Sequence, residues 1–201
     1  MRSDRRRRAP AELETDRLRL RPWRAGDLPA FTRIRRDADV ARYLGDGEPP
    51  SEAACECYLE DRMRRWLEHG VDAWAVELKE TGQLAGWVGL TVPERRPGSC
   101  LEIGWVLGRG HWGRGLATEA ARECLRCGFD DLHEPAIGAR HHIDNVASAR
   151  VMGRLGMTVT GDEVDRGRRY RVCGHQITSE QWRRSPGGQD HPRPCPRRGA
   201  G

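Results

Sequence analysis

A glycine-rich turn between two patterned segments is the feature of this 201-residue chain that most limits how it can fold. Residues 101–107, LEIGWVL, carry apolar side chains at every second position, which predicts a strand. Residues 116–126 carry them at helical spacing, which predicts a helix with one buried face. The turn contains four glycines, Gly108, Gly110, Gly113 and Gly115. Because glycine has no side chain to block a ligand, N–H groups at the start of the helix can bind phosphate, so we expect a pyrophosphate-bearing ligand here.

Two known signatures compete for this turn. Gly108, Gly110 and Gly113 spell G-x-G-x-x-G, the dinucleotide fingerprint. A Rossmann strand is usually a continuous apolar run, whereas this strand alternates and carries Glu102. The preceding sequence also indicates antiparallel hairpins instead of a βαβ unit, and the turn has no P-loop string. A Rossmann-type oxidoreductase therefore stays only as an alternative that the context disfavours.

The second signature extends over most of the chain. WGRGLATEA at Trp112–Ala120 resembles the acetyl-CoA loop of the GNAT superfamily of N-acetyltransferases, and specifically its RimJ/RimL-type branch. DNVASARVMGRLGM at Asp144–Met157 and the opening at Glu14–Phe31 resemble further segments of that branch, as does ITSEQW at Ile177–Trp182. The resemblance covers about residues 12–183. It implies an α/β (α+β) fold with a mostly antiparallel, twisted sheet of about six to seven strands, flanked by helices and splayed at the central strand.

The resemblance also implies which residues bind the cofactor. The superfamily pattern Q/R-x-x-G-x-G/A puts Gly115 and Ala117 at the small positions, while Trp112 stands where Gln or Arg is usual. In the family, the strand before the loop binds the pantetheine arm through its backbone. The implied acetyl-CoA residues are Trp105, Val106, Leu107, Gly113, Arg114, Gly115, Ala117, Thr118 and Asn145. For Asn145, a helix N-cap is an equally weighted alternative, since one side chain can hardly do both.

Two residues are the implied catalytic groups. Ser148 matches a serine to which the branch assigns the role of general acid or of a hydrogen-bond partner of the thiol; its alternative is an ordinary polar residue in a first helical turn. Glu102 is the candidate base, acting through water; its alternative is a surface charge opposite an arginine of a neighbouring strand. Tyr170 and His175 could also reach the site. His141 and His142 are expected to be structural or exposed.

The cysteines indicate free thiols. The seven cysteines are scattered and odd in number, which suits a reducing cytoplasm. Cys124 and Cys127 form a C-x-x-C pair, but it lies inside the predicted helix, and we expect helix packing there and no metal site. No apolar run is long enough to span a membrane, and no apolar segment follows the basic start, so the expected location is cytoplasmic.

Positive charge is concentrated at the two ends of the chain. Residues 1–8 and 183–201 each carry five Arg and one Asp, a net +4 for each end. The whole chain carries +5, which leaves −3 for residues 9–182. We therefore expect disordered tails at 1–11 and 184–201 around one N-acetyltransferase domain at 12–183. The tails could contact nucleic acid, although solvated tails without a partner are favoured; the domain is not a basic nucleic-acid module.

Periodicity and caps outline the other elements. Asp27 and Ser51 are candidate N-caps, and Gly70 and Gly156 are expected to end helices. The expected strands are 17–21, 73–78, 84–92, 136–140, 157–160 and 170–178, in addition to 101–107.

Three functional classes follow. The leading one is an N-acetyltransferase that moves the acetyl group of acetyl-CoA to a primary amine, either a protein N-terminus, which could be ribosomal, or a small molecule. A non-catalytic acetyl-CoA-binding protein and a Rossmann-type oxidoreductase are the alternatives. The residues that select the amine are expected in Gly45–Pro50, Glu94–Ser99 and Gly161–Arg169.

Overall fold

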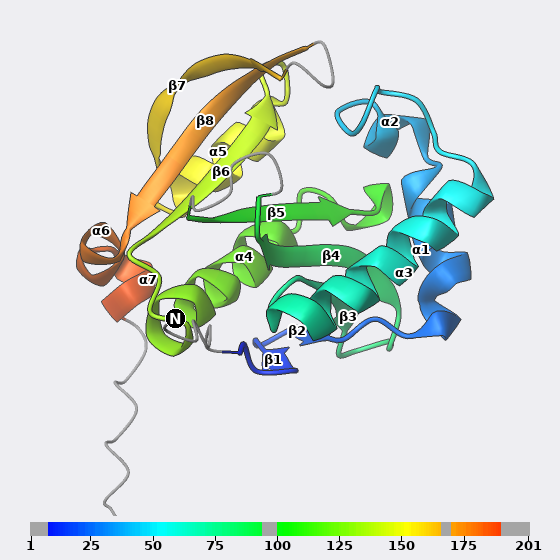
Figure 1. The fold of residues 1–201 in the computed structure, drawn as a ribbon, viewed down its shortest axis with the longest axis horizontal. Helices are drawn as coiled ribbons and strands as arrows, with labels where there is room; N and C mark the ends of the chain where they lie inside the picture. The colour runs from blue at the N-terminus through cyan, green and yellow to red at the C-terminus, as the bar shows by residue number, and fades with distance from the viewer. Residues whose placement is uncertain (1–7, 94–99, 166–169, 190–201) are drawn as a thin grey trace, which may run out of the picture.

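One twisted, open sheet flanked by helices forms the body of the molecule (Figure 1). The computed structural model describes residues 8–93, 100–165 and 170–189. The described strands follow the order β1-β2-β3-β4-β5-β6-β8-β7. They are β1 (Leu13–Glu14), β2 (Leu18–Arg21), β3 (Ala73–Leu78), β4 (Leu84–Thr91), β5 (Leu101–Leu107), β6 (Ala136–His142), β7 (Thr158–Asp165) and β8 (Tyr170–Thr178). The helices are α1 (Leu28–Arg35), α2 (Ala38–Ala41), α3 (Glu52–His69), α4 (Leu116–Arg126), α5 (Val146–Arg154), α6 (Ser179–Arg184) and α7 (Pro186–Gln189).

The predicted fold class is confirmed, with one strand more than the six to seven expected. The additional strand is β1, whose Leu13 pairs with Leu20 of β2. Two residues are too few to show a period, so the sequence pattern could not reveal this strand. β7 also extends to Asp165, beyond the expected end at Thr160.

The sheet splits between β5 and β6. β4 and β5 pair along six residues each, from Gly86↔Leu107 to Thr91↔Glu102. β5 and β6 are the parallel neighbours in the described sheet, and they pair only at Leu101↔Ile137 and Glu102↔Gly138. Past these two pairs the strands diverge, as Figure 1 shows. The divergence leaves one edge of β5 without a strand partner from Ile103 to Leu107, which is the splay that the family resemblance implies.

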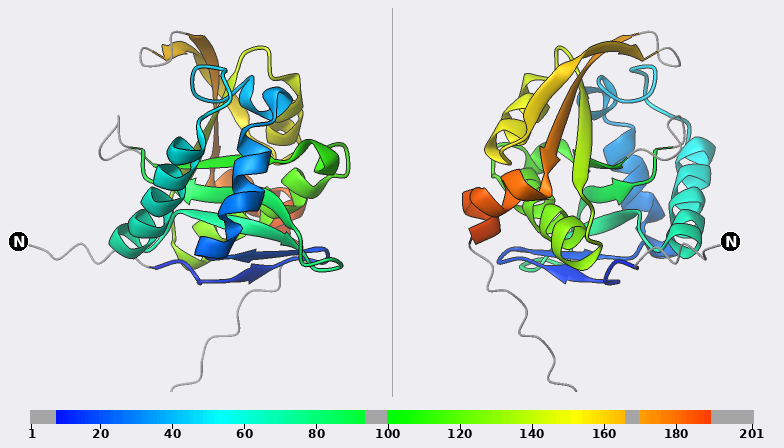
Figure 2. Two further views of the ribbon diagram at one scale, coloured as in Figure 1. Left: turned by 90° about the vertical axis from the view of Figure 1, so that its right-hand side faces the viewer. Right: turned by 60° about the vertical axis from the view of Figure 1, so that its left-hand side comes forward.

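Helices cover both faces of the β1–β5 half (Figure 2). Successive side chains of a strand point to opposite faces, so β3 contributes to two separate apolar clusters. Trp74 packs in the larger cluster with Leu116 of α4, whereas Ala75 packs with Phe31 of α1 and Leu59 of α3. Full burial of such side chains stabilises the fold by about 1.5–3 kcal/mol each. α4 also packs against β4 and β5 on its side of the sheet.

Most of the predicted helix ends are confirmed. Ser51 Oγ accepts a hydrogen bond from Ala54 N–H at 3.1 Å, and Gly70 ends α3 with φ of +70°, as predicted. Asp27 differs from the prediction. Its carboxylate accepts hydrogen bonds from the guanidinium of Arg21 at 2.8 Å and from Arg24 N–H at 2.9 Å instead of capping α1. The buried Arg21 needs a counter-charge, which explains this choice of partner.

The described structure extends past both expected domain boundaries. At the start, Ala9 is buried and its N–H donates to Gly70 O at 2.8 Å. At the other end, α6 and α7 carry the chain to Gln189, and Trp182 is buried against Phe129. Within the described ranges, no helix has both the length and the apolar character needed to cross a membrane.

Candidate active site

The glycine turn presents free backbone donors at the start of α4. Gly113 and Gly115 have left-handed φ angles of +72° and +77°, which glycine adopts without steric cost. The first backbone hydrogen bond of α4 runs from Glu119 N–H to Gly115 O at 3.0 Å. The N–H groups of residues 116–118 therefore have no acceptor within the helix. A helix start of this kind favours the binding of an anion.

Arg17 fixes this turn from the β1–β2 side. Its guanidinium donates to Arg114 O at 3.0 Å and to Glu119 Oε2 at 2.7 Å, on either side of Gly115. Thr15 Oγ1 donates to Glu119 Oε1 at 2.5 Å, and Arg17 N–H donates to the same oxygen at 3.0 Å. Burial opposes ionisation of Glu119, but these hydrogen bonds outweigh it and lower its pKa. The turn is thus held by a segment about a hundred residues away in the chain.

Trp112 ties the turn to β5. Its Nε1–H donates to the carbonyl oxygen of Leu107, the last residue of β5, at 2.7 Å. The indole thereby gives a structural reason for a tryptophan at a position where Gln or Arg is usual in the pattern. The contact places the turn beside the free edge of β5, next to Trp105 and Val106.

A cavity of about 340 Å³, the loop cavity, lies between the end of β5, the start of α4 and α5. All predicted cofactor residues except the exposed Arg114 line it: Trp105, Val106, Leu107, Gly113, Gly115, Ala117, Thr118 and Asn145. Two of its polar atoms, Thr118 Oγ1 and His111 Nδ1, are buried and have no hydrogen-bond partner in the described part of the chain. Burial, and then the nearby charge of Arg114, lower the pKa of His111. Buried polar atoms are nearly always paired, so these two are available to a ligand.

Asn145 and Ser148 stand where two cavities meet. Both residues line the loop cavity and also a second cavity of about 220 Å³, the split cavity, which lies over the divergence of β5 and β6. Asn145 Oδ1 accepts a hydrogen bond from Ser148 N–H at 3.0 Å and so caps α5. The N-cap alternative for Asn145 is thus confirmed, and because the cap uses only the amide oxygen, the NH₂ group remains a donor.

Glu102 lies at the last residue pair before β5 and β6 diverge, on the wall of the split cavity. Its Oε2 accepts a hydrogen bond from Arg140 Nη2 at 3.0 Å, and Arg140 Nη1 is 3.5 Å from Glu163 Oε1. This pairing across neighbouring strands is the arrangement that the surface-charge alternative expects. Oε1 of Glu102 has no donor among the described residues, so the carboxylate can still accept a proton.

Three further residues at the cavities were not assigned by sequence reasoning. Tyr43 lines both cavities, and its ring centroid is 5.5 Å from that of His142. Arg150 and Arg154 are exposed on successive turns of α5 at the rim of the loop cavity. The arginine spacing of four residues was a usable signal, since it places both on one helix face. Nothing local in the sequence marks Tyr43. Only the folded chain brings Tyr43, which follows α2, to the walls of the two cavities.

Of the remaining candidates, His141 and His175 lie beside each other. His141 is buried at the wall of the split cavity, and its Nε2 lies 3.2 Å from His175 Nε2. Burial, and then His141, lower the pKa of His175. The side chain of Tyr170 and the segment Glu94–Ser99 lie outside the described residues.

Two buried thiols are unreactive. Cys124 and Cys127 are fully buried on α4 and in the π-helical turn that follows it. Burial raises the pKa of Cys127 to about 12 and raises that of Cys124 as well. Neither thiol is therefore a nucleophile at neutral pH.

The chain belongs to the GNAT acetyltransferases. The family described as acetyltransferase (GNAT) domain matches residues 17–158. This range includes the glycine turn, the residue pairs at which β5 and β6 diverge, and α5. Members of this family use acetyl-CoA, and acetyltransferase activity is the function that this membership establishes.

Particular relatives agree with this assignment. The uncharacterized protein YkkB of Bacillus subtilis (strain 168) is 34% identical over 153 residues, covering 74% of this chain and 86% of the relative. The uncharacterized N-acetyltransferase p20 of Bacillus licheniformis is 27% identical, covering 74% and 83%. Among solved structures, a GNAT-family acetyltransferase from Bacillus anthracis has the same fold, with a TM-score of 0.74 and 24% identity over 84% of this chain and 99% of that one. RimL, a ribosomal L7/L12 alpha-N-protein acetyltransferase solved with coenzyme A, shares the fold at a TM-score of 0.70 and 15% identity, covering 85% and 97%.

Proposed function

We propose that this protein moves the acetyl group of acetyl-CoA to a primary amine, with acetyl-CoA in the loop cavity and the amine in the split cavity. The observation that carries the proposal is that the two cavities share Asn145 and Ser148 as common wall residues. A reaction between two bound substrates needs their reactive groups held side by side, and much of the rate comes from that positioning.

The residues of the loop cavity fit acetyl-CoA. Its pyrophosphate would accept hydrogen bonds from the N–H groups of residues 113–118, and the exposed Arg114, Arg150 and Arg154 would supply positive charge nearby. The unpaired Thr118 hydroxyl supplies a further polar contact. The free edge of β5 at Trp105–Leu107 would bind the pantetheine arm through its backbone, and the Asn145 NH₂ group would donate to the same arm. The thioester supplies an activated acetyl group.

Ser148 and Glu102 would manage the protons. The amine nitrogen attacks the thioester carbonyl, the carbon–sulfur bond breaks, and the thiolate takes up a proton. Ser148 is one turn into α5 at the junction of the cavities, from where its hydroxyl would donate a proton or a hydrogen bond to the sulfur. Glu102, through water and its free Oε1, would accept the proton that the amine loses.

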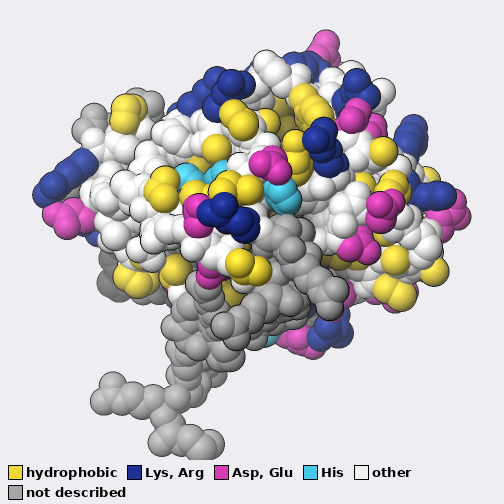
Figure 3. All heavy atoms as spheres, turned by 90° about the horizontal axis from the view of Figure 1, so that it is seen from above, with side chains coloured by type: hydrophobic (Ala, Val, Ile, Leu, Met, Phe, Trp, Pro, Cys, Tyr) yellow, Lys and Arg dark blue, Asp and Glu magenta, His cyan; other side chains and the backbone are white. Residues whose placement is uncertain are grey.

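For the acceptor, we propose the N-terminal amine of a protein, with a small-molecule amine as the second candidate. RimL, which shares the fold, is an alpha-N-protein acetyltransferase. This likeness supports a protein N-terminus as the acceptor, and it supports our proposal that the chain belongs to the RimJ/RimL-type branch. Figure 3 looks down on the end of the molecule at the top of Figure 1 and shows Lys and Arg interspersed with Asp and Glu. Because this face carries both positive and negative side chains, it would not attract a polycation strongly. An acceptor recognised by its shape and its backbone groups is favoured instead. A ribosomal protein is one such partner.

The wider organisation is also a proposal. We propose that residues 12–183 form the catalytic domain, that the described flanks at 8–11 and 184–189 extend its packing, and that the remaining basic ends are accessory. The cysteines that the structure describes are all unpaired, which supports a reducing compartment such as the cytoplasm.

A screen of amines tests the proposed reaction. The protein is incubated with acetyl-CoA and a panel of free and N-blocked peptides, diamines and aminoglycosides, and CoA thiol release is measured against a blank of protein without acetyl-CoA. We expect release with one class of free amine and none with blocked peptides. A melting shift with acetyl-CoA but no release on any amine would support the non-catalytic alternative. A shift with NAD and none with acetyl-CoA would contradict the proposed cofactor site; the mostly antiparallel sheet already rules out the Rossmann-type alternative.

A further inference from the structure

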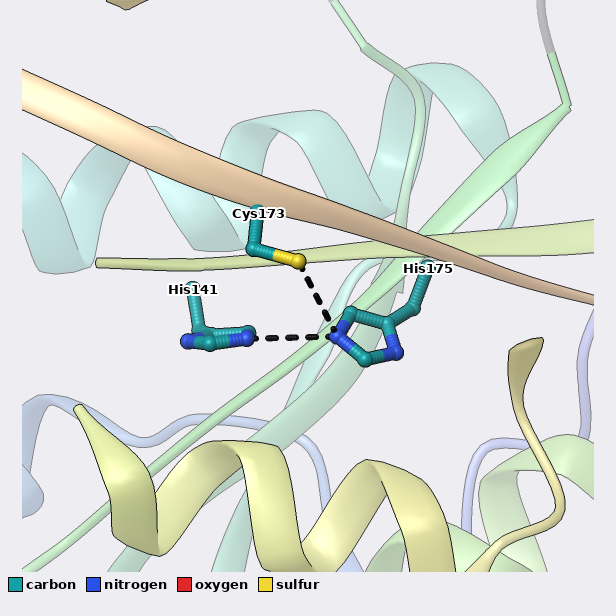
Figure 4. Close-up of side chains that lie close together, drawn as sticks. All are labelled: His141, Cys173 and His175. Carbon is teal, nitrogen blue, oxygen red and sulfur yellow. Dashed lines mark hydrogen bonds between the residues drawn. The ribbon is translucent and has the colours of Figure 1, made fainter. Parts of the chain in front are cut away.

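His141, Cys173 and His175 form a compact cluster on one face of β6 and β8 (Figure 4). Cys173 and His175 are two residues apart on β8, so their side chains point to the same face. His141 pairs with Cys173 in the strand register and is therefore diagonal to His175. Both histidines are buried and Cys173 is half-buried. The register of the two strands thus brings two imidazoles and a thiol together.

The tautomer of His141 is fixed by its backbone neighbour. His141 Nδ1 lies 2.8 Å from the carbonyl oxygen of His142. A carbonyl only accepts, so Nδ1 carries the hydrogen and the Nε2 of the neutral ring presents a lone pair. Orientation of a ligand imidazole by a hydrogen bond from its other nitrogen is the usual arrangement at metal sites.

The distances between the three candidate ligand atoms match a tetrahedral metal site. Zinc–nitrogen bonds of about 2.0–2.1 Å and zinc–sulfur bonds of about 2.3 Å, at tetrahedral angles, require about 3.3 Å between two nitrogens and about 3.6 Å between sulfur and nitrogen. His141 Nε2 and His175 Nε2 are 3.2 Å apart, and Cys173 Sγ and His175 Nε2 are 3.6 Å apart. All three ligand atoms lie within 4.8 Å of one another, so a small rotation of the thiol would complete the set.

We propose that His141, Cys173 and His175 bind one Zn²⁺ ion, with water in the fourth position. The expectation from the sequence was that the chain has no metal site, because its C-x-x-C pair lies inside a predicted helix and no second pair follows at ligand spacing. Two imidazoles and one thiolate are the borderline-soft donors that zinc prefers. The thiol loses its proton to solvent when the sulfur binds the metal. Without a metal, the Nε2–H of His175 would donate a hydrogen bond to Nε2 of His141 instead. The experiment below separates the metal-bound form from this hydrogen-bonded form.

The site is connected to the start of α5. The carbonyl oxygen of His142 that fixes His141 also accepts a hydrogen bond from Asn145 N–H at 2.8 Å. Asn145 caps α5 and orients the turn that carries Ser148. A bound metal would therefore hold the first turn of this helix and stabilise the folded state by mass action.

A cobalt titration of the full chain, without an affinity tag, tests the proposal. After treatment with a chelator, the protein is titrated with Co²⁺, and the thiolate-to-cobalt charge-transfer absorption and the visible bands are recorded. We expect one equivalent to bind, Zn²⁺ to displace it, and Mg²⁺ to leave it unchanged. We expect Cys173→Ser to lose the charge-transfer band and His175→Gln to bind at least tenfold more weakly. Cys100→Ser, a half-buried cysteine outside the cluster, is the matched control and should titrate like the wild type.

A second measurement needs no variant. Zn²⁺ should protect Cys173 from alkylation, as read by mass spectrometry of the modified peptides, while the exposed Cys57 reacts equally with and without the metal. Absence of any cobalt band in the wild type, an unchanged titration in folded Cys173→Ser, or equal alkylation of Cys173 in both conditions would each overturn the proposal. None of these results bears on acetyl transfer, which the amine screen tests separately.

Discussion

Gly115 offers the sharpest test of the proposed cofactor site. It precedes α4 with φ of +77° and ψ of 0°. A Cβ built on it would meet only Arg17 Nη2, at 3.7 Å, so a side chain has space but the backbone conformation is unfavourable. An L-residue in this conformation costs roughly 1–2 kcal/mol. Gly115→Gln and Gly115→Glu should therefore both lower Tm, by about 2–8 °C for a domain of this size.

The charge of the glutamate adds an effect on binding alone. A carboxylate on the order of 5 Å from a pyrophosphate dianion, in water, raises the free energy of the complex by about 1.7 kcal/mol. This repulsion corresponds to roughly 15-fold weaker binding of Gly115→Glu relative to Gly115→Gln. A drier site has a lower dielectric constant and enlarges the difference.

Calorimetric titration with CoA and thermal melting measure the two effects separately. Gly110→Glu is the control, because a Cβ at Gly110 meets no atom within 4 Å and its φ is not left-handed. We expect this variant to keep the wild-type Tm and to bind CoA within a few-fold of wild type. Equal CoA affinity of the two Gly115 variants and the wild type would refute the location of the phosphate site.

Three other predictions follow from the site and its supports. Ser148→Ala and Glu102→Gln should each lower kcat, by ~10²–10⁴-fold where the group transfers a proton, with little change in KM for acetyl-CoA; full activity of both in steady-state assays would mean that positioning alone suffices. The lowered pKa of Glu119 means that its stabilising effect is present above its ordinary pKa of 4.5 and is lost as the pH falls through its folded-state value. Glu119→Gln should therefore reduce both the stability at neutral pH and its loss in acid, as followed by urea unfolding at a series of pH values; an unchanged acid dependence would contradict this role. Arg150→Ala should weaken CoA binding about threefold, and more at low salt, whereas Arg183→Ala on α6 should not; equal titration curves for the two variants would remove Arg150 from the site.

Local sequence predicted the elements whose signals are complete within a few residues. The Ser51 cap and Gly70 stop of α3, the alternation along β5 and the glycines before α4 depend only on neighbouring positions. One local signal was missed. Thr178 and Gln181 form a reciprocal capping box that begins α6, a helix that is not among the predicted elements.

The tertiary structure alone decided which of these elements meet. The divergence of β5 and β6, the pairing of Glu102 with Arg140 and the shared cavity wall at Ser148 depend on strand register and packing between distant segments. The contact of His141 with His175 likewise joins residues 34 apart, and a register shift of one residue would turn one of them to the opposite face. Propensity and periodicity describe how a segment folds on itself. The relative placement of segments is set by the burial of their apolar faces together, which no single segment contains.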